Sequence, residues 1–292
     1  MVHIQGNGPA LVLIPGIQGR WEYARPTVEA LAAHFRVVTF SLGGGSRDEI
    51  FNTQVDRISS VLDAHHIDRA ILCGISYGGL IAARFAALHP ERTAALVMAS
   101  TPGPDWHLRP RHHVYARWPW LFGPLFLVET PFRLRAELAA ALPDPADRRR
   151  FVRWQLRTIL SAPVSLLQMA GRARELPLPN IVADCRRVTA PTLIVTGERA
   201  LDRVVPVDGT MSYAGLIHGA RHLELERTGH QGTITRPSAF AAAIKEFVAS
   251  AVRLKPDATD FQPVVDAKSD AVDAESDVAS GFSRTIPGSE VA

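Results

Sequence analysis

The stretch ILCGISYGGLIAARFAALHP, residues 71–90, places one serine between glycines at the point where an apolar run meets a helical pattern. A strand that passes directly into a helix at one residue must bend sharply, and the bend residue is forced into strained φ/ψ space. Gly74 and Gly78, two residues before and two after Ser76, remove the Cβ atoms that would clash in such a turn. The pattern therefore predicts a side chain that stands clear of the carboxyl edge of a sheet.

The predicted position of Ser76 suits a nucleophile. It lies at a helix N-terminus, where free backbone N–H groups favour developing negative charge. A serine hydroxyl there can attack a carbonyl carbon while the N–H of Tyr77 faces the oxygen that becomes anionic. Residues 74–78 match the G-x-S-x-G pattern of a nucleophile elbow, which favours catalysis by a serine.

The first 100 residues alternate between short apolar runs and helix-like segments. The runs, rich in Val, Ile and Leu, predict buried strands. Strands that alternate with helices indicate βαβ units, and we expect an α/β fold with a mostly parallel, twisted sheet and helices on both faces. The expected strands are 11–14, 36–40, 70–73 and 94–99, and the expected helices are 25–34, 49–66 and 77–89.

The pattern changes after residue 101. β-branched runs vanish and Trp, Arg, Leu and Pro take over, which predicts a helical insertion. Strand patterns then return, and an amphipathic helix follows. The elements expected in this half are helices 131–142, 146–160 and 238–252 and strands 191–198 and 221–227. We therefore expect an α/β core from residues 1–101 and 188–252, a helical cap at 102–187, and a disordered tail at 253–292.

Composition excludes several classes of protein. Residues 101–187 carry fourteen arginines against seven acidic residues, but they lack the long basic runs of a nucleic-acid-binding arm, so no nucleic-acid partner is expected. No apolar run approaches the ~18 residues of a transmembrane helix, so we expect no stable membrane insertion. The two cysteines, Cys73 and Cys185, lie far apart in apolar surroundings, which favours reduced thiols and a cytoplasmic location.

Histidine pairs at 65–66 and 112–113 raise the question of a metal site. Neither pair is joined by Cys or carboxylates at ligand spacing, and serine chemistry of this type needs no metal. We expect no metal and no cofactor.

The strand, serine turn and helix at residues 70–89 resemble the α/β-hydrolase superfamily, in particular its branch of serine hydrolases with a helical cap. The resemblance covers about residues 2–252. Members carry the catalytic histidine in a loop before the last helix, where this chain has Thr228-Gly229-His230. The resemblance implies that His230 is the base that takes the Ser76 proton.

The resemblance also implies an acid in the turn after the first strand that follows the cap. Members commonly show Gly-x-x-Asp followed by x-Val-Pro. Asp202 has the expected distance to Val205-Pro206, although two extra residues separate it from the preceding glycine. We expect Asp202 to complete the catalytic triad, and Glu198 and Asp105 are the alternatives.

An oxyanion hole requires two backbone N–H groups. Tyr77 supplies one by its position in the elbow. By the resemblance, the second comes from the loop at residues 15–19, and its position makes Ile17 the donor. Losing one such donor typically costs ~2.7–4 kcal/mol of transition-state stabilisation.

The resemblance implies a serine esterase that cleaves a carboxylic ester, lactone or thioester through an acyl-enzyme intermediate. An acyltransferase or a C–C bond hydrolase on the same triad, or a non-catalytic hydrolase-fold protein that binds a ligand, are the alternatives. The aromatic residues of the cap favour a small-molecule acyl substrate that is apolar or amphipathic. The sequence does not indicate an oligomeric state.

Overall fold

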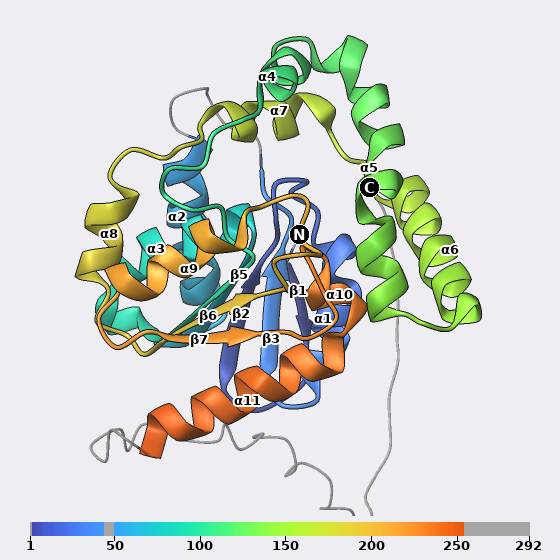
Figure 1. Ribbon diagram of the computed structural model, residues 1–292. Coiled ribbons are helices and arrows are strands. Elements are labelled where there is room, and N and C mark those ends of the chain that lie inside the picture. The colour runs from blue at the N-terminus through green and yellow to red at the C-terminus, as the bar shows by residue number, and fades with distance from the viewer. Residues whose placement is uncertain (1, 44–49, 254–292) are drawn as a thin grey trace, which may run out of the picture. The chain divides into compact units, whose positions relative to one another are not determined.

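A computed structural model of the chain describes residues 2–43 and 50–253, which form a seven-stranded sheet with helices on both faces (Figure 1). The strand order is β1-β3-β2-β4-β5-β6-β7. Neighbouring strands are parallel except β1 and β3, which are antiparallel. The expected α/β fold class is therefore confirmed. The strands are β1 (Val2–Gln5), β2 (Ala10–Ile14), β3 (Arg36–Phe40), β4 (Ala70–Ile75), β5 (Thr93–Ala99), β6 (Thr192–Thr196) and β7 (Arg221–Glu224).

The helices fall into those that cover the sheet and those inserted between β5 and β6. The covering helices are α1 (Arg25–Ala32), α2 (Ile50–Ala64), α3 (Tyr77–Leu88), α9 (Val207–Leu216), α10 (Gly232–Thr235) and α11 (Pro237–Arg253), with the 3-10 helices η1 (Trp21–Ala24) and η2 (Pro90–Arg92). The inserted helices are α4 (Pro110–Arg117), α5 (Pro119–Ala141), α6 (Pro145–Ser161), α7 (Leu166–Arg174) and α8 (Ile181–Arg187). In the described part of the chain, no helix is both long and apolar enough to cross a lipid bilayer.

Both faces of the sheet are buried, and strand geometry decides which residues go to which face. Successive side chains of a strand point to opposite sides. Leu11 and Leu13 of β2 therefore pack with α1 and α11, whereas Val12 and Ile14 pack with α2 and α3. All four side chains are fully buried. This explains why the central strands are continuous apolar runs in the sequence.

The strands and helices expected between residues 11 and 99 are confirmed to within a few residues at their ends. The expected start of one helix at residue 49 lies outside the described residues, and α2 is described from Ile50. Strand β1 was not expected. Its four residues are half-buried or exposed at the sheet edge, and they include His3 and Gln5, so they form no apolar run.

The first helix expected within the insertion starts earlier than its sequence suggests. Helix α5 begins at Pro119 instead of residue 131, and it contains both Pro124 and Pro131. A proline in a helix interior removes one backbone hydrogen bond, which is why the expected helix began there. In the turn before Pro131, the Thr130 hydroxyl donates to the carbonyl of Phe126 at 2.8 Å. The helix expected at 146–160 is confirmed as α6.

Two other expectations about organisation stay predictions. One is the division into a core and a cap at residues 102–187; α8, near the end of that range, packs against α3 of the sheet. The other is the disordered tail at 253–292, which lies outside the described residues apart from Arg253 at the end of α11.

Candidate active site

Ser76 lies at the apex of the turn between β4 and α3. Its backbone has φ 54° and ψ −120°, a conformation that side-chain-bearing residues rarely adopt. A Cβ at Gly74 would lie 2.3 Å from the carbonyl oxygen of Gly78, and a Cβ at Gly78 would lie 2.3 Å from that of Ile14. The Ser76 N–H donates to the Ala99 carbonyl at 2.7 Å, which ties the turn to β5. The strained turn predicted at Ser76 is therefore confirmed.

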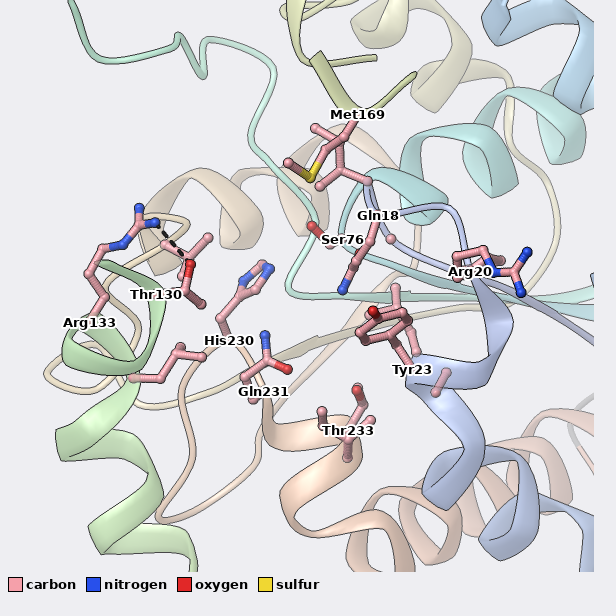
Figure 2. Close-up of a pocket in the computed structure, with 18 of the residues that line it drawn as sticks. Gln18, Arg20, Tyr23, Ser76, Thr130, Arg133, Met169, His230, Gln231 and Thr233 are labelled. Carbon is pink, nitrogen blue, oxygen red and sulfur yellow. Dashed lines mark hydrogen bonds between the residues drawn. The ribbon is translucent and has the colours of Figure 1, made fainter. Parts of the chain in front are cut away.

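Ser76 and His230 line the same cavity, which has a volume of about 160 Å³. Figure 2 shows the imidazole of His230 directed toward the side of the cavity on which the Ser76 hydroxyl lies. The insertion supplies part of the wall, including Phe126 of α5 and Met169 of α7. The cavity is thus shared between the carboxyl edge of the sheet and the inserted helices.

The carboxylate of Asp202 lies against His230. The distance from His230 Nδ1 to Asp202 Oδ2 is 3.5 Å, which is longer than a well-formed hydrogen bond but within the range of an ion pair. The other oxygen, Oδ1, accepts hydrogen bonds of 2.9 Å from the amides of Val204 and Val205. The Asp202 side chain is only 2% exposed and that of His230 10%. Asp202 is therefore fixed by its own turn and faces the histidine.

Burial and charge act in opposite directions on the pKa values of this pair. Burial alone raises the pKa of Asp202, but the charge of His230 and the two amide hydrogen bonds outweigh it, so the pKa lies below its ordinary value. Burial alone lowers the pKa of His230, but Asp202 and then Glu137 outweigh it, so this pKa lies above its ordinary value. The surroundings therefore favour an imidazolium beside a carboxylate, the state that a general base reaches after accepting a proton.

The two alternative acids lie elsewhere. The Glu198 carboxylate accepts a hydrogen bond from the amide of Arg227, and the Glu198 N–H donates to the Thr228 carbonyl at 2.8 Å. These bonds join the loops that follow β6 and β7. Asp105 is exposed in the connection between β5 and α4. Among the described residues, the carboxylate within 4 Å of the His230 ring nitrogens belongs to Asp202.

The loop after β2 lies beside the elbow. A Cβ at Gly16 would lie 3.5 Å from the Cβ of Ser76, and Ile17 lines the same cavity as Ser76. Tyr77 is the first residue of α3, and the first N–H groups of a helix have no partner within it. The two segments expected to supply the oxyanion hole thus flank Ser76. The roles of all five expected site residues stay predictions.

Helix α7 and the residue that follows it contact both the loop after β2 and the start of α3. Sequence reasoning missed these contacts. Arg172 is 1% exposed, and its guanidinium donates to the Ile17 carbonyl at 3.0 Å and to two carbonyls of the segment after β3. Glu175, just after α7, accepts a 2.6 Å hydrogen bond from the Tyr77 hydroxyl. No local pattern marks these residues, because the contacts join positions 155 and 98 apart in the chain.

Helix α5 contacts the histidine loop in a comparable way. Glu137 is fully buried, and its Oε1 accepts a 2.6 Å hydrogen bond from the N–H of Gln231, the residue after His230. The sequence gives no local signal for this contact, since Glu137 lies within an ordinary helical pattern.

Within residues 2–43 and 50–253, no three His, Cys, Asp or Glu side chains gather to hold a metal ion. His112, from one of the histidine pairs, instead lies near arginines. Burial, together with Arg133, Arg111 and Arg109, lowers the pKa of His112 to about 4. This positive surrounding is unlike that of a metal ligand.

Comparisons with known proteins agree with the fold. The model of the alpha/beta hydrolase fold family matches residues 9–124. The pimeloyl-[acyl-carrier protein] methyl ester esterase of Xanthomonas axonopodis pv. citri is 28% identical over 259 residues, covering 85% of this chain and 98% of that protein. The enzyme of the same name from Nitrosomonas europaea is 27% identical, over 82% and 97% of the two chains. An enol-lactonase from Burkholderia xenovorans LB400 has the same fold, with a TM-score of 0.67, 22% identity, and coverage of 85% and 96%.

The sheet, the serine turn at Ser76 and the helices inserted between β5 and β6 are arranged as in the α/β-hydrolase fold. The resemblance to the α/β-hydrolase superfamily expected from the sequence is therefore confirmed, and the similar proteins named above are methyl ester esterases and an enol-lactonase.

Proposed function

We propose that the protein hydrolyses carboxylic esters of small apolar acyl groups through an acyl-enzyme intermediate on Ser76. One observation carries the proposal: a serine held at a strained elbow shares a cavity with a histidine whose ring faces a buried carboxylate. The same arrangement of nucleophile, base and acid recurs in serine hydrolases of unrelated folds.

In the acylation half, the Ser76 oxygen attacks the ester carbonyl carbon while His230 takes the hydroxyl proton. The carbonyl π electrons move to the oxygen, and the N–H groups of Ile17 and Tyr77 stabilise the oxyanion. The intermediate collapses when the C–O bond to the alcohol breaks. His230 gives its proton to the leaving alcohol, and the acyl group remains on Ser76.

In the deacylation half, a water molecule takes the place of the alcohol. His230 accepts a proton from this water as its oxygen attacks the acyl carbon. The bond to Ser76 then breaks, the proton returns to the serine oxygen, and a carboxylic acid leaves. Throughout both halves, Asp202 holds the imidazole and stabilises its charged form.

The cavity supports a small acyl group. Its volume of about 160 Å³ is close to the ~150 Å³ of an engineered apolar cavity that holds one benzene molecule. An acyl group of about six heavy atoms would fill it, with Phe126 and Met169 as apolar contacts. Because the esterases named above act on a methyl ester, we also propose a small leaving alcohol.

The proposal extends to partner and location. A small molecule is the proposed partner. The thiols of Cys73 and Cys185 are buried and unpaired, which supports a reducing compartment and hence a cytoplasmic location.

The decisive experiment combines turnover with active-site labelling. We expect a burst of p-nitrophenol from p-nitrophenyl acetate and labelling by a fluorophosphonate at Ser76, both lost in Ser76→Ala. Ser100→Ala is the matched control, because Ser100 is also buried, follows a strand and has a positive φ of 47°. It should keep the label. Labelling at a residue other than Ser76, or a burst that survives Ser76→Ala, would contradict the proposal.

The acyl preference is measured with p-nitrophenyl esters of increasing chain length. The cavity volume predicts the highest kcat/KM at about four to six acyl carbons. A preference for acyl chains of twelve or more carbons would contradict the proposed substrate class while leaving the serine chemistry intact.

A further inference from the structure

Glu137 brings a buried carboxylate from the helical insertion to the back of the histidine loop. Its side chain is 0% exposed. One oxygen, Oε1, accepts the 2.6 Å hydrogen bond from the Gln231 amide, whereas Oε2 has no hydrogen-bond partner among the described residues. Burying an acid with an unpaired oxygen costs free energy, and an apolar side chain would fill the same space without that cost. Packing alone therefore does not account for an acid at this position.

We propose that Glu137 is a positioning residue for His230. Its hydrogen bond to Gln231 holds the backbone of the histidine loop against α5, and its negative charge stabilises the imidazolium that forms when His230 accepts a proton. The inference rests on the proposed role of His230 as the base. It makes the insertion part of the machinery that keeps the base in place.

The charged groups that face Glu137 come mainly from the loops that follow β6 and β7. His230 favours the ionised form of Glu137, and Asp202 disfavours it. The backbone amides of Gly229 and Gln231 also favour the ionised form, the latter through the 2.6 Å hydrogen bond to Oε1. His230 is thus the group whose charge responds most directly to Glu137.

Other elements near Glu137 offer it little charge. Helix α10 packs against α5, as Figure 1 shows at the C-terminal end of α5, and its four residues are uncharged. On α5 itself, Arg133 lies one turn before Glu137. Its guanidinium donates to the Thr130 hydroxyl at 3.4 Å and lies 3.5 Å from the ring of His112. Arg133 is therefore engaged on the side of α4.

Because Glu137 is buried, its carboxylate takes up a proton near neutral pH. Burial is the largest influence, and it raises the pKa of Glu137 to about 7 despite the amide hydrogen bonds and His230. In turn, the charge of Glu137 contributes to the raised pKa of His230. Removing that charge should therefore lower the pKa of His230.

The test separates the charge of Glu137 from its hydrogen bond. Glu137→Gln keeps the size and an acceptor oxygen but removes the charge, and Glu137→Leu removes both. The acid limb of kcat/KM is measured with p-nitrophenyl butyrate. The His230 imidazole is titrated by NMR, with its signal assigned by its absence from His230→Gln.

For Glu137→Gln we expect the midpoint of the acid limb and the midpoint of the NMR titration to move to lower pH by about half a unit or more. The reason is that a nearby negative charge raises a histidine pKa. For Glu137→Leu we expect the same shift and a further loss of kcat, about fivefold or more, with little change in KM, because the loop loses its anchor. Recovery of kcat in Glu137→Gln relative to Glu137→Leu identifies the hydrogen bond as the cause.

Glu129→Gln is the matched control. Glu129 lies on the same helix, is partly buried, and accepts a 3.0 Å hydrogen bond from the Tyr115 hydroxyl. Neither midpoint should move in this variant. Equal shifts in Glu129→Gln and Glu137→Gln would overturn the inference, because the effect would then be a general one of charge in the insertion.

The outcomes distinguish this inference from the proposed function. Unchanged midpoints in Glu137→Gln, in an enzyme that still depends on Ser76, would overturn the positioning role and leave the hydrolase intact. Hydrolysis that does not depend on Ser76 would overturn the proposed function, and the NMR titration would still decide whether Glu137 sets the pKa of His230. Should Glu137→Leu fail to fold, Glu137→Gln alone decides.

Discussion

The guanidinium of Arg172 donates a 3.0 Å hydrogen bond to the carbonyl of Ile17, although 155 positions separate the two residues. The same guanidinium donates to the carbonyls of Leu42 and Gly43, at 3.1 and 3.0 Å. One buried side chain of α7 thus holds the segments that follow β2 and β3. The segment after β2 is the loop proposed to supply an oxyanion donor.

Replacing Arg172 by methionine should lower kcat by roughly tenfold to a hundredfold with a smaller effect on KM. The reason is that the Ile17 N–H would lose its orientation, and a lost oxyanion donor costs about 10²–10³ in kcat. Arg172→Lys should recover only part of the rate, because an ammonium does not present the planar fork of donors that reaches several carbonyls. Steady-state kinetics of both variants, with circular dichroism to check folding, test this. A folded Arg172→Met enzyme with kcat within twofold of wild type would contradict it.

Asp202→Asn should slow hydrolysis by about 10³-fold or more, because an amide does not stabilise the imidazolium and favours the wrong tautomer. Glu198→Gln is the matched variant: it also changes an acid to an amide in the same turn, and it keeps an acceptor for the Arg227 amide. Its rate should stay within about threefold of wild type. Measured kcat/KM values decide, and the reverse order of effects would move the acid to Glu198.

The pH dependence of kcat/KM should show an acid limb with its midpoint above about 6.5, the ordinary pKa of histidine. Below the midpoint His230 is protonated and does not accept the serine proton, so the rate falls as the pH falls. In Asp202→Asn the midpoint should lie lower than in wild type, because the main charge that raises the His230 pKa is gone. A midpoint at higher pH in that variant would refute the assignment.

Stability should depend on pH through Glu137. Its pKa rises from 4.5 to about 7 on folding, so the folded state binds the proton more tightly than the unfolded state. The free energy of unfolding contributed by this group therefore falls as the pH rises through that window. Relative to wild type, Glu137→Gln should gain on the order of 2 kcal/mol between pH 4.5 and pH 8, measured by urea unfolding. A difference that stays constant with pH would contradict this.

Phe126→Ala should shift the acyl preference to longer chains, because the ring lines the cavity. The ratio of kcat/KM for octanoyl over butyryl esters should rise by about tenfold, the scale on which apolar pockets discriminate methylene groups. Phe132→Ala on the same helix is the control, since its ring is 75% exposed and outside the cavity lining. An equal change in both variants would show that the effect comes from α5 as a whole.

The architecture and the elbow could be predicted from the sequence because their causes are local. A strand buried on both faces, such as Leu11–Ile14, must be apolar throughout. The turn at Ser76 leaves no room for a Cβ at Gly74 or Gly78, so glycine at both positions reports the turn. Strand β1 escaped prediction because an edge strand that is partly exposed needs no such pattern.

The contacts made by the insertion could not be predicted in this way. Three residues, Glu137, Arg172 and Glu175, bond to core residues that lie 94 to 155 positions away in the chain. The residues next to them in sequence form no pattern that predicts these contacts. The sequence also favours Asp202 as the acid without excluding Glu198 or, farther away, Asp105. Glu198 and Asp202 lie in one short turn, and the fold of that turn decides which carboxylate faces the histidine.

The bonds from α5 and α7 to the loops beside Ser76 and His230 limit how this enzyme can be re-engineered. The inserted helices look like an exchangeable module, since they form one continuous segment between β5 and β6. Grafting a foreign segment there to obtain a new specificity would also delete Glu137, which holds the histidine loop, and Arg172, which holds the loop after β2. A successful chimera would need cavity-lining residues for the new substrate and, in addition, an acid and a cation placed as Glu137 and Arg172 are.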